Sequence, residues 1–228
     1  MIEWMDEGVV EGVKQSGFLL ADGKRRVPGL AWTPQGRARS LVLLGHGASG
    51  SKRTDYIQAV ARRLVRQHGF AAVAIDGPVH GDRRTDTGAS EARVFEDFRR
   101  AAKHDTDLTD TMVADWTAVL DGLEETEVFG RVPVAYWGLS MGTMLGLPFV
   151  AQEPRISAAV LGLMGVGVET GERLAKDASL LTCPVLFMVQ WNDELIPRDT
   201  ALALFDKIAS KKKTLLAHPG SHVAVPRS

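Results

Sequence analysis

A serine flanked by glycines lies in the middle of the chain, in the segment GLSMG at residues 138–142. Ser140 follows the apolar run 132–137 and precedes the apolar segment 143–151, which predicts a turn between a strand and a helix. Such a turn needs small neighbours, and the start of the helix stabilises negative charge that develops during acyl transfer. Because so short a pattern also arises by chance, interpreting Ser140 as a nucleophile depends on the partners that the chain supplies.

A base and an orienting acid are required as well, because a serine hydroxyl is a weak nucleophile at neutral pH. We expect the base to be His222, in the loop after the last apolar run. His218, at the end of that run, is the alternative and is better suited to a structural role. For the acid, Asp193 comes just after an apolar run, and Glu194 is the alternative. The order Ser, Asp, His matches one of the three well-known triad orders.

Short apolar runs separate these candidates, and they are typical of strands buried on both faces of a parallel sheet. Residues 8–34 are typical of an antiparallel hairpin that turns near Asp22 and Gly23. The predicted fold class is therefore α/β, with a mostly parallel central sheet, an antiparallel N-terminal hairpin and helices on both faces. Residues 1–228 are interpreted as one domain. The predicted strands are 40–45, 70–76, 132–138, 157–164, 184–191 and 213–218, and apolar stripes predict helices within 56–65, 108–123 and 201–208.

One connection, at about residues 82–107, is longer and more charged than a link between a strand and a helix needs. It leaves the carboxyl edge of the predicted sheet, where ligands bind, so it is a candidate lid or rim of the site. The alternative is a solvated surface helix that packs through Phe95 and Phe98.

The composition argues against several classes of partner. With 27 basic and 28 acidic side chains the net charge is -1, which gives no field to attract nucleic acid or an anionic membrane. No apolar run approaches the roughly eighteen residues of a membrane span. The N-terminal segment is acidic where a signal peptide is basic, and Cys183 has no second cysteine to pair with, so we expect a cytoplasmic protein.

Five motifs in order along the chain, LLGHGASG, AIDGPVHGD, GLSMG, WNDELIP and GSH, resemble those of α/β-hydrolases, in particular the small single-domain members of the dienelactone-hydrolase type. The resemblance covers nearly the whole chain. It implies an oxyanion hole made by the backbone N–H groups of Ala48 and Met141, and structural roles for His46 and His80. No cofactor is implied. A metal is not expected either, because His46, Asp76, His80 and Asp82 have no recognisable ligand spacing.

The resemblance is incomplete in ways that bear on the substrate. Dienelactone hydrolases carry a cysteine nucleophile, whereas Ser140 indicates a carboxylesterase that cleaves small-molecule esters through an acyl-enzyme. Residues 165–182 are too few for the large helical cap of many relatives, and the chain stops soon after His222 without their final helix. The same triad would serve a thioesterase, a lactonase or a peptidase, and a ligand-binding protein could keep the fold without turnover. The sequence does not reveal the oligomeric state.

Overall fold

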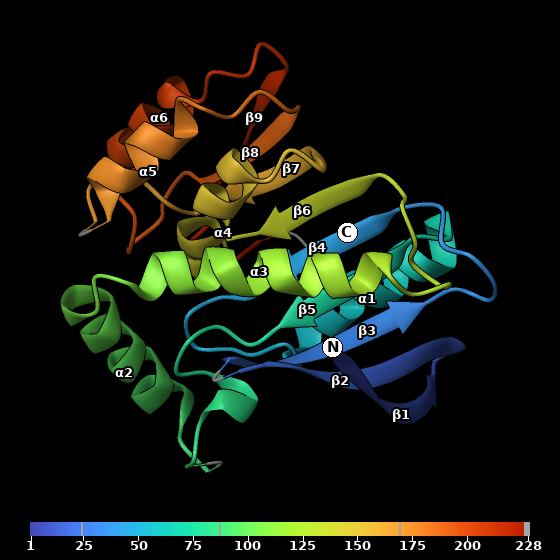
Figure 1. Ribbon diagram of the computed structural model, residues 1–228. Coiled ribbons are helices and arrows are strands. Elements are labelled where there is room, and N and C mark those ends of the chain that lie inside the picture. Colours follow the sequence, from blue (N-terminus) through green and yellow to red (C-terminus); the bar gives the residue numbers. More distant parts are fainter. Residues whose placement is uncertain (24, 87, 169, 226–228) are drawn as a thin grey trace.

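A computed structural model of the chain has strands β1 to β9 in one sheet, in the order β1-β2-β3-β5-β4-β6-β7-β8-β9 (Figure 1). The structure describes residues 1–23, 25–86, 88–168 and 170–225, without the side chains of residues 6 and 7. The strands are β1 (Ile2–Val10), β2 (Val13–Asp22), β3 (Arg25–Thr33), β4 (Leu41–Gly45), β5 (Ala71–Ile75), β6 (Val134–Gly138), β7 (Ile156–Gly162), β8 (Val185–Gln190) and β9 (Lys213–His218). The helices in these ranges are α1 (Asp55–His68), α2 (Glu91–His104), α3 (Leu108–Glu124), α4 (Met141–Gln152), α5 (Gly171–Ala178) and α6 (Arg198–Lys207), with a short 3₁₀ helix η1 (Gly81–Arg83).

The amino-terminal strands are antiparallel and extend one side of the sheet. β2 pairs with β3 so that Asp22 lies opposite Arg25, and the predicted hairpin turns at this position. β1 also pairs with β2, and this strand was not predicted from the sequence. Its Trp4 and Met5 are exposed by 39% and 51%, so this edge strand lacks the alternation of apolar and polar residues that marks a half-buried strand.

The strands from β4 to β9 pair in parallel. Every residue of β4 and β5 is buried, which explains why these strands are continuous apolar runs in the sequence. Each of the six strands predicted for this part matches an observed strand to within two residues at either end. The predicted α/β class with a mostly parallel sheet is confirmed.

Helices cover both faces of the sheet (Figure 1). α1 packs on one face through Ile57, Ala61 and Val65, and Gly69 ends it with a φ of 65°, in the left-handed conformation that glycine adopts most easily. α3 crosses the other face, and α4 packs beside it with residues 141–150 all buried. Among the described residues, no helix is both long enough and apolar enough to span a membrane.

The charged connection after β5 contains η1 and α2. Ser90 caps α2 by accepting a hydrogen bond from the N–H of Arg93, at 3.3 Å. The predicted surface helix is therefore present, but it packs through Val94 and Phe98, whereas Phe95 is only half-buried. Phe98 is 5% exposed and belongs to the main core, so this part of the connection is anchored to the body of the protein.

Candidate active site

The candidate nucleophile, acid and base follow three parallel strands at one edge of the sheet. Ser140 comes after β6, Asp193 after β8 and His222 after β9. The carboxyl ends of parallel strands meet at the same edge, so a parallel sheet brings residues together that are far apart in the sequence.

Two hydrogen bonds connect these side chains in a row. Ser140 Oγ lies 2.9 Å from His222 Nε2, and His222 Nδ1 lies 2.8 Å from Asp193 Oδ2. Because a carboxylate only accepts, the imidazole proton is on Nδ1 and Nε2 accepts from the hydroxyl. His222 is 8% exposed and the Asp193 side chain 3%, so water competes little for these bonds. The structure thus brings together the three residues that the sequence singled out.

The two alternatives that the sequence left open have other partners. Glu194 Oε2 accepts a hydrogen bond from the backbone N–H of His222, at 2.9 Å, and so holds the histidine loop rather than the imidazole ring. His218 lies at the end of β9, and its carbonyl accepts hydrogen bonds from the N–H groups of Trp191 and Gly220. Neither residue has a place in the row from Ser140 to Asp193.

The Asp193 carboxylate is held by its own loop. Its Oδ1 accepts hydrogen bonds from the N–H groups of Leu195 and Ile196, at 2.8 and 2.9 Å. The other oxygen, Oδ2, is left to bind His222. Two backbone donors thereby fix the carboxylate and, through it, the orientation of the imidazole ring.

Ser140 lies in a strained backbone conformation, with φ 58° and ψ -121°. The flanking glycines are needed sterically: a Cβ on Gly138 would lie 2.7 Å from the carbonyl oxygen of Gly142, and a Cβ on Gly142 would lie 2.5 Å from that of Gly45. A non-glycine residue in such a conformation costs about 1–3 kcal/mol and persists only where its surroundings enforce it.

A buried threonine behind the turn supplies part of that enforcement. Thr143 Oγ1 accepts a hydrogen bond from the N–H of Gly162 at 2.7 Å and lies 2.8 and 2.7 Å from the carbonyl oxygens of Gly138 and Gly162. The same Gly162 carbonyl accepts from the N–H of Ser140, at 3.0 Å. Thr143 was not among the residues singled out from the sequence, and no spacing or motif in the sequence could have marked it.

Two backbone N–H groups, one in the loop after β4 and one at the start of α4, have no hydrogen-bond acceptor in the part of the chain that the structure describes. Met141 is the first residue of α4, where N–H groups have no partner within the helix. Among the described residues, neither its N–H nor that of Ala48 has a hydrogen-bond acceptor. These are the two amides expected from the sequence to form an oxyanion hole.

His46 fixes the peptide unit to which the Ala48 N–H belongs. The N–H of Gly77 donates to His46 Nε2 at 2.9 Å, so the ring proton is on Nδ1 and donates to the Gly47 carbonyl at 2.8 Å. Burial, with a smaller effect of His80, lowers the pKa of His46 to about 4, so this neutral form persists at ordinary pH. In a trans peptide the C=O and N–H point in opposite directions, so holding the Gly47 carbonyl also directs the Ala48 N–H.

A buried lysine, which no sequence pattern singled out, ties the same loop to the end of β5. Lys52 is 1% exposed, and its ammonium bonds to Asp76 and, at 2.6 Å, to Asp82. Its backbone N–H also donates to Asp76, at 3.0 Å. In the part of the chain that the structure describes, no three His, Cys, Asp or Glu side chains are placed to bind one metal ion.

Comparison with known proteins places the chain in a family. The alpha/beta hydrolase family model matches residues 41–224. A cold-adapted esterase from an Arctic intertidal metagenomic library, in complex with polyethylene glycol, shares 45% identity over 98% of this chain and 92% of its own, with a TM-score of 0.86. No curated protein matches the chain.

More distant structures share the fold. Dienelactone hydrolase from Anabaena variabilis has 19% identity over 92% of this chain and 88% of its own, with a TM-score of 0.68. Acetyl xylan esterase 1 from Thermoanaerobacterium has 19% identity over 98% and 83%, with a TM-score of 0.69. The match of the family model and the 45% identical esterase show that the chain belongs to the alpha/beta hydrolase family, and the family, fold class and esterase-type hydrolase class predicted from the sequence are confirmed.

Proposed function

We propose that the protein is a serine carboxylesterase in which Ser140 is the nucleophile, His222 the general base and Asp193 the group that orients it. The row of hydrogen bonds from Ser140 Oγ through His222 to Asp193 carries this proposal. The 45% identical esterase supports an ester as the substrate.

In the first step Ser140 Oγ attacks the ester carbonyl carbon while His222 Nε2 takes the hydroxyl proton. The C–O bond that forms converts the carbonyl into a tetrahedral oxyanion, and Asp193 stabilises the imidazolium. His222 then gives its proton to the leaving alcohol oxygen as the bond to that oxygen breaks. The product of this half-reaction is an acyl ester of Ser140 and a free alcohol.

In the second step a water molecule takes the place of the alcohol. His222 removes its proton as the oxygen attacks the acyl carbon, and returns the proton to Ser140 Oγ when that bond breaks. The carboxylic acid leaves and the enzyme is restored. We assign the oxyanion of both steps to the Ala48 and Met141 amides, each worth about 3–4 kcal/mol of transition-state stabilisation in sites of this type.

The first test is the variant Ser140→Ala, assayed on short-chain p-nitrophenyl esters together with labelling by a fluorophosphonate probe. We expect hydrolysis to be lost and the probe to label the wild type only, with the fold retained because the variant loses only the hydrogen bond from Ser140 Oγ to His222 Nε2. Full esterase activity in this variant, or no labelling of the wild type, would overturn the assignment.

The same chemistry serves other acyl compounds, so the substrate class needs its own test. We would compare kcat/KM across a panel of oxygen esters that vary separately in acyl and alcohol size. The panel also contains a thioester, a lactone and a peptide amide of the same acyl group. We expect the oxygen esters to be preferred. A fold retained only for ligand binding would show no turnover of any member of the panel.

A further inference from the structure

The loop that follows β5 has a strained backbone and contacts residues 46–48, named here the oxyanion segment because they include the Ala48 N–H. Val79 has a φ of 57°, a conformation that is unfavourable for a β-branched residue and persists only where contacts enforce it. One such contact comes from Arg84, whose Nη1 donates to the Val79 carbonyl at 3.0 Å. The loop is therefore held in place by a side chain that comes from the charged connection.

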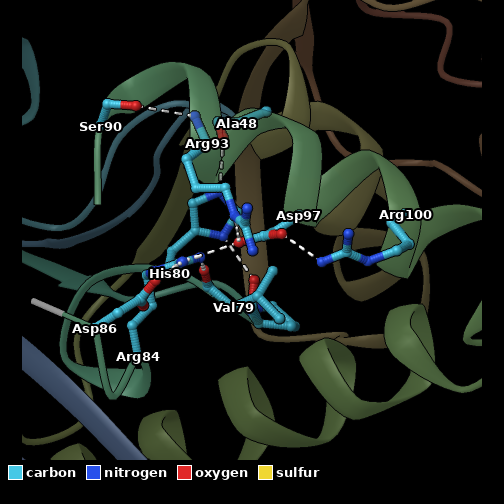
Figure 2. A network of polar contacts seen from close by, with 10 residues as sticks. Ala48, Val79, His80, Arg84, Asp86, Ser90, Arg93, Asp97 and Arg100 are labelled. Carbon is cyan, nitrogen blue, oxygen red and sulfur yellow. Dashed lines mark hydrogen bonds and ion pairs between the residues drawn. The ribbon is translucent and has the colours of Figure 1, made fainter. Parts of the chain in front are cut away.

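Arg84 is in turn bound to α2 (Figure 2). Its Nη2 donates to Asp97 at 2.9 Å, and Asp97 also accepts hydrogen bonds from Arg93 and Arg100. The hydrogen bond from Arg84, with smaller effects of the hydrogen bond from Arg93 and of the charges of Arg93 and Arg100, lowers the pKa of Asp97 to about 2, so the carboxylate stays charged at any pH of interest. The strained loop and α2 thus form one connected unit.

His80 joins this unit to the oxyanion segment. The ring is fully buried, and it packs against Phe98 of α2 with ring centroids 5.4 Å apart. Its Nε2 lies 2.8 Å from the carbonyl oxygen of Ala48, a contact that Figure 2 also shows, and its Nδ1 lies 2.6 Å from the carbonyl oxygen of Pro78. A carbonyl oxygen only accepts, so a contact is a hydrogen bond only when that ring nitrogen carries a proton. Burial lowers the pKa of His80, and the neutral ring has one N–H, which either carbonyl can accept.

The two peptide units on either side of the Ala48 Cα are held by contacts to different residues. The unit that contains the Ala48 N–H is fixed through the Gly47 carbonyl, which accepts from His46 Nδ1 and from the N–H of Gly50. The unit that contains the Ala48 carbonyl lies against His80, whose Nε2 is 2.8 Å from the carbonyl oxygen. Because the two units meet at the Ala48 Cα, the chain at Ala48 is held from both sides.

We propose that His80 carries its ring proton on Nε2 and is a positioning residue for ester hydrolysis: its Nε2–H donates to the Ala48 carbonyl and helps to hold the Ala48 N–H where the oxyanion forms. The proposal rests on the function proposed above, in which that N–H stabilises the oxyanion. His80 itself touches no reacting atom. Through its contacts with Phe98 and with the Ala48 carbonyl, it connects the unit of Val79, Arg84 and Asp97 to the oxyanion hole.

A matched pair of variants separates the two ring nitrogens. The terminal amide of glutamine reaches about as far as histidine Nε2, whereas that of asparagine reaches about as far as Nδ1. His80→Gln therefore retains a donor for Ala48, and His80→Asn retains one only for Pro78. We expect kcat/KM for a short p-nitrophenyl ester to fall about tenfold or more in His80→Asn and to stay within about threefold of the wild type in His80→Gln, since losing one oxyanion donor completely costs about 10²–10³.

Two inhibitors test whether the fall in kcat/KM comes from weaker stabilisation of the oxyanion. An alkyl trifluoromethyl ketone forms a hemiketal oxyanion with the active-site serine, whereas the methyl ketone of the same chain serves as the control for binding in the ground state. In His80→Asn we expect the inhibition constant of the trifluoromethyl ketone to rise in proportion to the fall in kcat/KM, and that of the methyl ketone to change less than about twofold.

Equal losses in the two variants, a larger loss in His80→Gln, or an equal weakening of both inhibitors would overturn the proposal. If neither variant folds, Phe98→Leu loosens the ring contact while leaving the hydrogen bonds in place. It should weaken the trifluoromethyl ketone selectively, and unchanged affinity would overturn the proposal. Ser140→Ala is assayed alongside: full activity there refutes the proposed function, whatever the pair at residue 80 shows.

Discussion

Replacing Thr143 by valine removes one buried hydroxyl from behind the nucleophile turn and leaves the shape of the side chain nearly unchanged. The Gly162 N–H then loses its acceptor, and one of the carbonyls of Gly138 and Gly162 loses a donor. An unpaired buried donor costs about 1–3 kcal/mol and a lost hydrogen bond about 1 kcal/mol, so we expect a loss of about 2–4 kcal/mol in the free energy of unfolding.

For a chain of this size such a loss corresponds to a fall in melting temperature of about 5–10 °C. Ser140 is affected as well, because its N–H binds the same Gly162 carbonyl at 3.0 Å. We therefore expect kcat/KM for p-nitrophenyl esters to fall about tenfold, as the serine leaves its productive orientation. Urea unfolding followed by circular dichroism gives the stability, and initial rates give the activity.

Two control variants isolate the contribution of the Thr143 hydroxyl. Thr143→Ser keeps the hydroxyl and should retain most of the stability and activity. Thr117→Val removes a hydroxyl that binds the Val113 carbonyl within α3, where the helix itself supplies a donor, and should change stability by less than about 0.5 kcal/mol. If Thr143→Val unfolds at the same urea concentration as Thr117→Val, the buried hydroxyl does not support the nucleophile turn and its role in holding Ser140 is refuted.

Three further outcomes follow from the site. Asp193→Asn should lower kcat about 10³–10⁴-fold with the fold intact by circular dichroism, because the imidazole loses the partner that selects its tautomer; a loss below tenfold would exclude the assigned role. Lys52→Met should lower the free energy of unfolding by about 3–5 kcal/mol, since it leaves the buried Asp76 carboxylate without its opposite charge, and adding Asp76→Asn should restore part of the loss. The pKa of His46 falls from 6.5 to about 4 on folding, so between these pH values the unfolded chain binds one more proton than the folded chain. The free energy of unfolding should therefore decrease by up to about 3 kcal/mol as the pH falls through this range. His46→Asn should flatten this part of the pH profile, and an unchanged slope would contradict the assignment.

The sequence predicts the central strands well because burial on both faces leaves a continuous apolar run, as in β4 and β5. β1 was missed because this strand lies at the edge of the sheet, with Trp4 and Met5 exposed. Position relative to a strand end favoured Asp193 over Glu194, because the carboxyl ends of parallel strands share one edge, and the structure places the Asp193 carboxylate beside the His222 ring.

Residues that act through tertiary contacts gave no such signal. Thr143 and Lys52 lie in ordinary helical and loop sequence, and their importance comes from carbonyls and carboxylates that are far away in the chain. His80 was predicted to be structural, but only the folded chain shows that its ring reaches Ala48 from 32 residues away. Sequence periodicity reports burial and says little about which polar groups will meet.

The site also sets the order in which activity can arise as the chain folds. Ser140 and His222 are 82 residues apart, and β9, which carries the histidine loop, is the last strand in the described part of the chain. Contacts of such long range form late, because loop closure must precede them. In the proposed mechanism, a nascent chain can form the turn at Ser140 before the base His222 is in place. The onset of ester hydrolysis should then report the docking of β9 on β8 and serve as a marker for the completion of folding.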